Sequence, residues 1–389
     1  MSGLLVILGS AASAIVAVSA YYTLFVKKKP NVYTGNEKLR TFLDKNVPML
    51  KDNFSPSPLY WEGRLQTVLG LVYRDVPPAR FPYQRELFSL SDGGEVGLDF
   101  AMVDTPKDGK SLLVMFFPGL TSSSQSCYVR TLVTSLNNIG VSVVVFNNRG
   151  LGGVPFKTPR TFSASSTEDA VEVIQYLKQK YPGQRMMGLG TSLGGMVLCK
   201  YLVTYPKEAA EMFEAATIIS ISWDANGGTA NLENNLINRY LINMQLTKSL
   251  VNLAKKFLKT VKPPETFDMD AVMKAKTVRE FDAAVTAPQF GFSTVEDYYA
   301  SATTKGHVHK FPIPVFCLNA EDDPMCPESD LPTDEASATG SKLALVSTKY
   351  GGHLGFLEGT GNKPVHFMER FVEQLVSGIR LHGQTDLKL

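Results

Sequence analysis

Residues 186–195 have the sequence Met-Met-Gly-Leu-Gly-Thr-Ser-Leu-Gly-Gly, in which an apolar run meets a Gly-x-Ser-x-Gly turn. An apolar, helix-compatible stretch, residues 196–202, follows at once. A strand that turns straight into a helix holds its central serine in a strained backbone conformation, and side chains two residues before or after it would collide with neighbouring backbone. Gly190 and Gly194 avoid that collision because they have no Cβ. The pattern predicts that Ser192 is a nucleophile presented above the edge of a sheet.

The composition indicates a globular protein and argues against some kinds of partner. The chain has 389 residues, of which 44% are hydrophobic and 20% charged, so it can bury a large core. Its net charge is +2 and its Lys and Arg residues are spread along the chain, so no nucleic-acid partner is expected. The four cysteines show neither CxxC spacing nor grouping with histidine, and we expect no metal, no cofactor and no obligate protein partner.

The N-terminal region contains an uncharged stretch from Leu4 to Val26. A helix of about 23 residues, rising about 1.5 Å per residue, would cross the hydrocarbon core of a bilayer. Residues 1–30 are therefore predicted to be a single-pass anchor, with the bilayer as a partner and the endoplasmic reticulum as a candidate location. A cleaved signal peptide is the alternative, but it lacks a positive n-region. Lys27, Lys28 and Lys29 favour a cytoplasmic catalytic part.

The next segment, residues 31–84, is rich in proline and is predicted to be an irregular extension that wraps around the main domain. It includes the run Pro-Leu-Tyr-Trp-Glu-Gly-Arg-Leu-Gln-Thr-Val at residues 58–68. The residues alone indicate only a piece of chain docked on a surface, with no chemistry of its own.

Residues 85–222 and 311–389 are predicted to form an α/β core. Two alternating runs, 86–90 and 96–102, are joined by a Ser-Asp-Gly-Gly turn and predict an antiparallel hairpin at a sheet edge. Continuous apolar runs, most of them separated by helical stretches, then predict a mostly parallel, doubly wound sheet. These runs are residues 112–117, 141–146, 185–190, 217–222, 313–318 and 343–347.

Residues 223–310 interrupt this alternation of strands and helices. They contain helical stretches rich in aromatic residues and methionine, inserted between two predicted strands. This is the place where an α/β hydrolase carries a lid, and we expect a helical lid here. The alternative is an ordinary helical excursion that only adds core.

An activated serine needs a base, and the base needs an orienting acid. Of the five histidines, only His353 follows a predicted strand, and its flanking glycines let a loop bring the imidazole close to another side chain. Asp323 is the preferred acid, because the acid of such hydrolases usually precedes a short apolar stretch and a proline by about four residues. Asp322 stays an alternative. The order Ser192, Asp323, His353 is the order that the α/β-hydrolase fold requires.

The oxyanion of an acyl-transfer reaction is held by two backbone amides. The residue after the nucleophile, Leu193, supplies the first. The second is expected from the loop after the run 112–117, where Gly119 lets the backbone turn, so that Leu120 is the preferred donor and Thr121 the next.

The sequence also contains nine short motifs, at residues 63–67, 92–94, 118–121, 146–150, 158–161, 190–195, 272–276, 279–282 and 351–356. Together they resemble those of the membrane-anchored abhydrolase-domain-containing lipases, in the branch that hydrolyses phospholipids. The resemblance extends from about residue 56 to the end, and the family also has a single N-terminal anchor. It implies an α/β-hydrolase fold, lipid ester hydrolysis, a triad of Ser192, Asp323 and His353, and a lumenal catalytic part. The lysines favour the opposite orientation, so the topology stays open.

These observations predict a membrane-bound serine hydrolase that cleaves fatty acyl esters of phospholipids, of the phosphatidylcholine type, through an acyl-enzyme at Ser192. Within enzymes, the alternatives are a neutral acylglycerol lipase or carboxylesterase and an acyltransferase that uses an alcohol instead of water. A ligand-binding receptor built on an inactive hydrolase is disfavoured, because all three candidate triad residues are present.

Overall fold

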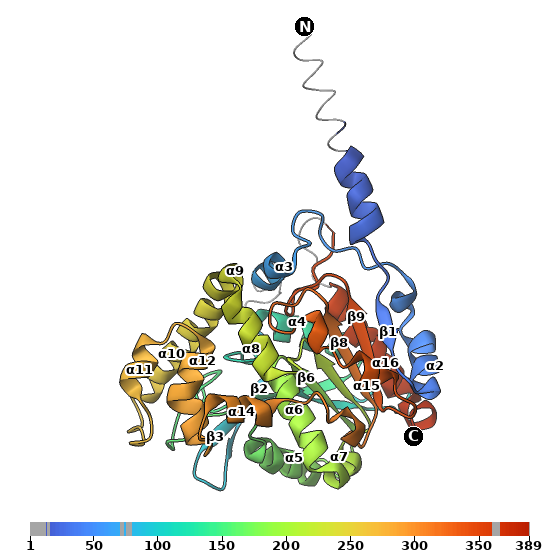
Figure 1. The fold of residues 1–389 in the computed structure, drawn as a ribbon. Helices are drawn as coiled ribbons and strands as arrows, with labels where there is room; N and C mark the ends of the chain where they lie inside the picture. The colour runs from blue at the N-terminus through green and yellow to red at the C-terminus, as the bar shows by residue number, and fades with distance from the viewer. Residues whose placement is uncertain (1–12, 14–15, 71–73, 75–79, 360–365, 389) are drawn as a thin grey trace, which may run out of the picture.

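The computed structural model describes residues 13, 16–70, 74, 80–359 and 366–388. Its centre is a nine-stranded sheet in the order β1-β9-β8-β7-β6-β4-β5-β3-β2 (Figure 1). The six strands from β9 to β5 run parallel, and β1, β3 and β2 add antiparallel edges. The strands are β1 (Asn31–Tyr33), β2 (Gln84–Ser89), β3 (Glu95–Ala101), β4 (Leu113–Phe117), β5 (Ser142–Asn147), β6 (Met186–Thr191), β7 (Ala216–Ile219), β8 (Val315–Ala320) and β9 (Leu343–Thr348).

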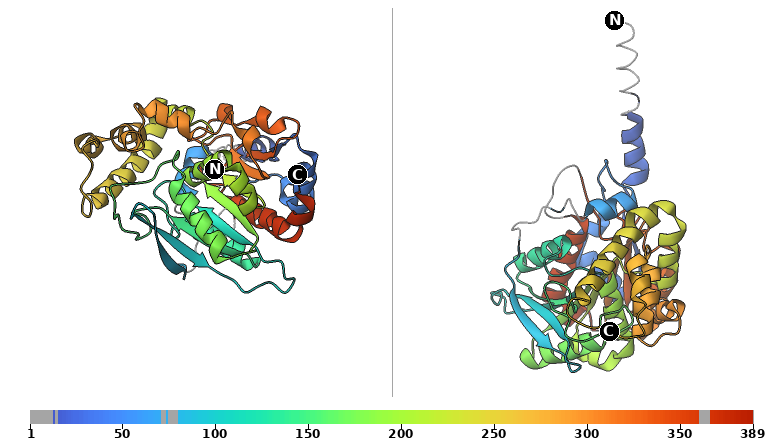
Figure 2. Two further views of the ribbon diagram at one scale, coloured as in Figure 1. Left: turned by 90° about the horizontal axis from the view of Figure 1, so that it is seen from below. Right: turned by 90° about the vertical axis from the view of Figure 1, so that its left-hand side faces the viewer.

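Helices cover both faces of this sheet (Figure 2). On β5, Val143 and Val145 belong to one core cluster, while Val144 and Phe146 belong to the other. Successive side chains of a strand point to opposite faces, so burial of both faces requires a continuous apolar run. One face packs against α2 (Glu37–Asn46), α4 (Cys127–Asn138) and α16 (Phe367–Asp386), and the other against α5 (Glu168–Lys180), α6 (Leu193–Thr204) and α7 (Pro206–Met212).

The chain between β7 and β8, residues 220–314, forms a layer of helices beside the sheet (Figure 1). We call it the inserted segment. It has a hydrophobic cluster of its own, which Leu151 and Phe156 of the core also join. Its main elements are α8 (Ala225–Asn234), α9 (Leu236–Asn238), η3 (Arg239–Asn243), α10 (Met244–Phe257), α11 (Met269–Lys274), α12 (Val278–Phe281), η4 (Asp282–Thr286), α13 (Ala287–Gln289) and α14 (Val295–Ala302).

The segment before the core is more regular than predicted. Residues 31–33 pair with β9 as an antiparallel edge strand, and α2 buries Leu39, Phe42 and Leu43. The side chain of Asn36 accepts hydrogen bonds from two amides of the first turn of α2, which explains where this helix begins. A further helix, α3 (Gly63–Gly70), follows in the same segment. The expectation of an irregular extension was therefore wrong for these residues.

The strand predicted at residues 217–222 is shorter than expected. β7 ends at Ile219, because Ser220 adopts a positive φ of 49° that a strand cannot contain. The other predicted strands differ from the observed ones by one or two residues at their ends.

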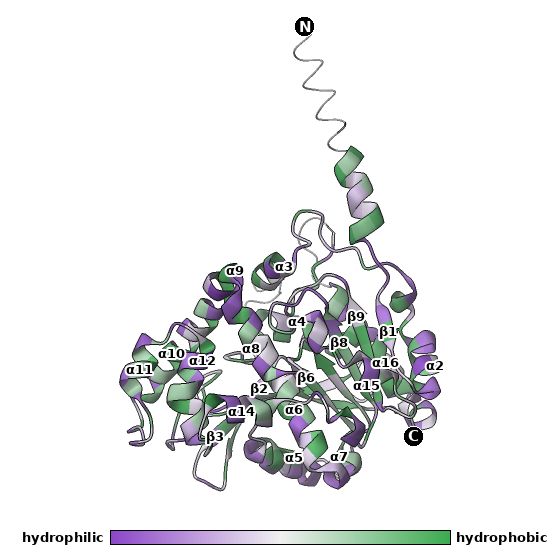
Figure 3. Cartoon of the chain, viewed as in Figure 1, coloured by the Kyte–Doolittle hydropathy of each residue, from purple (hydrophilic) through white to green (hydrophobic). Residues whose placement is uncertain are grey.

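Part of the predicted membrane anchor, residues 1–12 and 14–15, lies outside the described residues. Residues 16–26 are helical and project from the body, and Figure 3 shows apolar residues along this helix. Among the residues that the structure describes, no helix is both long and apolar enough to cross a membrane. The anchor therefore stays a prediction.

Arg149 joins three of the motifs that resemble the lipase family. Its guanidinium is 2.7 Å from a carboxylate oxygen of Asp92 and 2.6 Å from one of Asp169, and it donates to the Thr158 hydroxyl at 2.9 Å. The Arg149 side chain is nearly buried, so these partners offset the cost of removing its charge from water. Arg149 thus links the three motifs to one another through its side chain.

Candidate active site

Ser192 stands between β6 and α6 with φ 51° and ψ −126°. A Cβ at Gly194 would lie 2.1 Å from the Phe117 carbonyl oxygen, and one at Gly190 would lie 2.6 Å from the Gly195 Cα. Only glycine fits at both positions, as the turn requires. Ser192 also precedes the first turn of α6, whose free amides carry the positive end of the helix dipole.

His353 and Asp323 lie next to this serine. The Nε2 atom of His353 is 2.8 Å from the Ser192 Oγ, and its Nδ1 atom is 2.9 Å from Oδ2 of Asp323. The Asp323 side chain is fully buried, and its Oδ1 accepts the amide of Met325 at 2.8 Å, which fixes the carboxylate. This geometry lets His353 remove the serine proton while Asp323 orients the imidazole and stabilises its charged form.

Asp322 bonds to the backbone of the loop that carries His353. Its Oδ1 accepts the amide of Gly352 at 2.8 Å, and its buried Oδ2 has no partner among the described residues. Burial raises the pKa of Asp322 to about 8, helped by the charges of Asp323 and Glu62. A carboxyl whose pKa is raised and whose hydrogen bond goes to backbone is less suited than Asp323 to stabilise an imidazolium.

The two predicted oxyanion donors border the same cavity as Ser192 and His353. The amide of Gly119 is already used, because it donates to the Tyr128 hydroxyl at 2.8 Å. Within the described chain, the amides of Leu120 and Leu193 have no backbone acceptor. Both amides are thus available to a ligand.

Backbone strain is concentrated around this site. Five described non-glycine residues have a positive φ, and they lie in the loop after β4, at the nucleophile, after β7 and in the histidine loop. Strained conformations persist where surrounding structure enforces them, and they cluster at functional sites. The residues are Thr121, Ser192, Ser220, Leu354 and Phe356.

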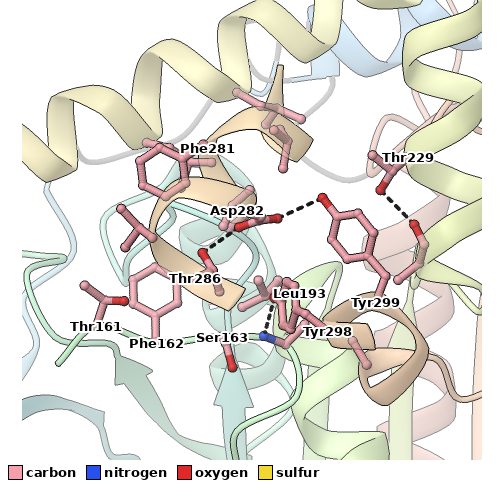
Figure 4. Close-up of a pocket in the computed structure, with 18 of the residues that line it drawn as sticks. Thr161, Phe162, Ser163, Leu193, Thr229, Phe281, Asp282, Thr286, Tyr298 and Tyr299 are labelled. Atoms are coloured by element: carbon pink, nitrogen blue, oxygen red, sulfur yellow. Dashed lines mark hydrogen bonds between the residues drawn. The ribbon is translucent and has the colours of Figure 1, made fainter. Parts of the chain in front are cut away.

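A mostly apolar cavity is lined by Ser192 and by residues of the inserted segment. Figure 4 shows part of this lining, including Phe281 and Tyr299. Its apolar lining includes side chains of α10, α12 and η4, among them Leu250, Phe257, Phe281 and Val285. A cavity of this character suits the hydrocarbon part of a substrate.

One carboxylate lines this cavity. Burial raises the pKa of Asp282 to about 6, although the hydroxyls of Thr286 and Tyr299 donate to it at 2.6 and 2.9 Å (Figure 4). The motif at residues 279–282 contains Asp282, but nothing in its local pattern shows that this side chain is buried at a cavity.

Comparison with known proteins identifies a matching family and similar relatives. A family model described as serine aminopeptidase, S33, matches residues 109–358. Phospholipase ABHD3 of Mus musculus is 36% identical over 388 residues, with 98% of this chain and 91% of the relative covered. Protein abhd-3.2 of Caenorhabditis elegans is 30% identical over 355 residues, with 91% and 92% covered.

Among solved structures, 2,6-dihydroxy-pseudo-oxynicotine hydrolase superposes with a TM-score of 0.52 at 16% identity, and covers 79% of this chain and 70% of its own. At that identity the likeness concerns the fold. The fold is that of an α/β hydrolase, as shown by the sheet order, the sharp turn at Ser192 between β6 and α6, and this likeness. With the family model and the relatives, this makes the chain a serine ester hydrolase.

Within that class, the chain belongs to the family described as serine aminopeptidase, S33, among its abhydrolase-domain-containing members. This confirms the family resemblance predicted from the short motifs.

Proposed function

We propose that this protein is a membrane-bound serine hydrolase that cleaves fatty acyl esters of phospholipids, of the phosphatidylcholine type, through an acyl-enzyme at Ser192. The observation that carries the proposal is the position of the Ser192–His353 pair at an apolar cavity. The relatives named phospholipase ABHD3, similar over nearly the whole chain, support the choice of a phospholipid.

The proposed reaction has two halves. His353 Nε2 takes the proton of Ser192 as its Oγ attacks the ester carbonyl carbon, and the resulting oxyanion is held by the amides of Leu120 and Leu193. When the tetrahedral intermediate collapses, the C–O bond to the alcohol breaks and His353 protonates the departing oxygen. Water, which gives a proton to His353, then attacks the acyl-enzyme; the bond between the acyl carbon and Ser192 Oγ breaks, His353 returns the proton to Oγ, and the fatty acid leaves. Asp323 orients the imidazole in both halves of the reaction.

In this proposal the inserted segment is the lid, and its apolar lining holds the acyl chain. Burying each methylene of a chain in such a cavity contributes about 0.8 kcal/mol, so fatty acyl esters are favoured over small ones. The alternative role of added core is less consistent with the open apolar cavity that the inserted segment shares with Ser192.

Exposed apolar side chains support a location at a bilayer. Val16, Val18 and Leu24 are exposed on the N-terminal helix, and Leu236 and Ile237 are exposed on α9. Exposed apolar patches mark contact with another apolar phase. We propose that residues 1–30 anchor the protein in the membrane and that the cavity faces the lipid from which substrate enters.

This function can be tested by assays of the full-length protein in phosphatidylcholine vesicles. We expect release of fatty acid and labelling of one serine by a fluorophosphonate probe, both lost in Ser192→Ala and both kept in Ser135→Ala, a control at a buried serine of α4. Labelling that persists in Ser192→Ala would refute the nucleophile. Faster release from monoacylglycerol, or ester formation with added ethanol, would favour the lipase or the acyltransferase instead.

A further inference from the structure

Helix α3 lies against the loop that carries His353, although it belongs to the segment before the hydrolase core. The two backbones approach without side chains between them: a Cβ at Gly352 would lie 2.0 Å from the Gly63 carbonyl oxygen, and one at Gly355 would lie 2.5 Å from that of Gln66. A Cβ at Gly63 would likewise lie 2.1 Å from the Asp322 carbonyl oxygen. Helix α3 is thus packed against both the loop after β8, which carries Asp323, and the loop after β9, which carries His353.

Thr67 makes the direct link between α3 and His353. Its Oγ1 accepts the backbone N–H of His353 at 2.8 Å and donates to the Gly63 carbonyl oxygen at 2.7 Å. The second bond is ordinary for a threonine within a helix. The first bond is not required by the helix. It fixes the backbone nitrogen of His353, which is bonded to the Cα atom that carries the imidazole side chain.

The same helix also holds the end of the loop. The amide side chain of Gln66, fully buried, accepts the N–H of Leu357 at 2.7 Å and donates to the carbonyl oxygens of Leu357 and Tyr60, at 3.3 and 2.8 Å. Arg74, just beyond α3, donates to the Gly355 carbonyl oxygen at 2.8 Å. The loop is therefore held from one side at three points: His353, Gly355 and Leu357.

We propose that Thr67 is a positioning residue for His353, acting through its backbone amide. The inference rests on the proposed function, since it concerns the same triad. Without the Thr67 hydroxyl, the His353 N–H would be left without its acceptor, and the loop would shift to find another. The Nε2–Oγ distance of 2.8 Å to Ser192 would change with it. A displacement of about 1 Å at reacting groups can cost about a hundredfold in rate.

The test replaces the hydroxyl by a methyl group of the same size. Thr67→Val removes the acceptor, Thr67→Ser keeps it, and Thr217→Val is the matched control, because Thr217 is fully buried in β7 and its hydroxyl has no partner among the described residues. Full-length proteins in vesicles are compared by the rate and the end point of fluorophosphonate labelling, the pH profile of that rate, and the thermal unfolding midpoint.

We expect Thr67→Val to label to the same end point as wild type but about ten- to a hundredfold more slowly. Its kcat on a soluble ester should fall with KM unchanged, and Thr67→Ser should recover most of the loss. If Thr67→Val labels as fast as Thr217→Val, or if Thr67→Ser is as slow as Thr67→Val, the inference is wrong. Should Thr67→Val fail to fold, Thr67→Ala against Thr217→Ala gives the same comparison.

The two proposals fail in different ways. Labelling that survives in Ser192→Ala would remove the proposed nucleophile, whatever Thr67 does. Labelling that is lost in Ser192→Ala but normal in Thr67→Val would overturn only the role of Thr67.

Discussion

Asp322 and Asp323 are adjacent in the chain, yet their carboxylates serve different loops: Asp323 Oδ2 is 2.9 Å from the His353 ring, while Asp322 Oδ1 accepts the Gly352 amide at 2.8 Å. One carboxylate thus faces the base and the other faces the backbone that carries it. This division separates two residues that sequence reasoning left as alternatives.

Asparagine substitutions distinguish the two carboxylates. Asp323→Asn should lower kcat by about 10⁴-fold, because an amide can favour the wrong imidazole tautomer, as in other serine hydrolases. Asp322→Asn keeps an oxygen for the Gly352 amide and should lose far less. Hydrolysis of p-nitrophenyl butyrate at pH 7 measures both. A larger loss in Asp322→Asn would make Asp322 the acid.

The raised pKa of Asp322 leads to a prediction of how the stability of the protein depends on pH. Its pKa is raised from the usual 3.8 to about 8 in the folded protein, so between these values the folded state holds a proton that the unfolded state has lost. Stability contributed by this group therefore falls as pH rises from about 4 to about 8, and is constant above that.

The variant Asp322→Asn should lack this contribution to the pH dependence of stability. The thermal midpoints of wild type and variant should diverge, in favour of the variant, between pH 6.5 and 8. Asp282, with a pKa of about 6, titrates mostly below this window. Parallel midpoints across the window would show that Asp322 is ionised in the folded protein.

Filling the cavity should shorten the acyl chains that are accepted. Val285 lines the cavity and is buried, so Val285→Phe should reduce kcat/KM for long-chain esters roughly tenfold or more while sparing butyrate esters. The control is Val261→Phe, at a valine that packs on the same hydrophobic cluster. An equal loss for long and short chains would argue against acyl binding in this cavity.

Tyr128 is expected to support the predicted oxyanion loop. Tyr128→Phe leaves the Gly119 amide without its acceptor, which should cost about 1–3 kcal/mol of stability and slow the labelling of Ser192. Tyr201→Phe, at an equally buried tyrosine of α6, should change the labelling rate little. Equal labelling rates in the two variants would remove Tyr128 from this role.

The residues of the site that could be predicted are those whose backbone conformation requires particular residues nearby in the sequence. Ser192 is identified by glycines two residues away on either side, and His353 by the glycines of its loop, because each imposes a conformation that few other residues tolerate. The continuous apolar runs predicted the parallel sheet for a similar reason, since a strand buried on both faces has no polar side.

The parts that could not be predicted depend on contacts between distant segments. Thr67 and His353 are 286 residues apart, and nothing in the local pattern of residues 58–68 points to a histidine. β1 was missed because a strand of three residues is too short to show a period. The signal for α2 was present but was overlooked, since Leu39, Phe42 and Leu43 recur at helical spacing after Asn36. The burial of Asp282 depends in the same way on how the inserted segment folds back on the core.

The position of α3 changes where a working fragment of this enzyme must begin. The family model covers residues 109–358, which include Ser192, Asp323 and His353. A recombinant protein trimmed to that region would keep every candidate catalytic side chain and yet lose Thr67 and Gln66, which hold the histidine loop. We expect such a fragment to be a poor catalyst, and the smallest active unit to start upstream of Gly63.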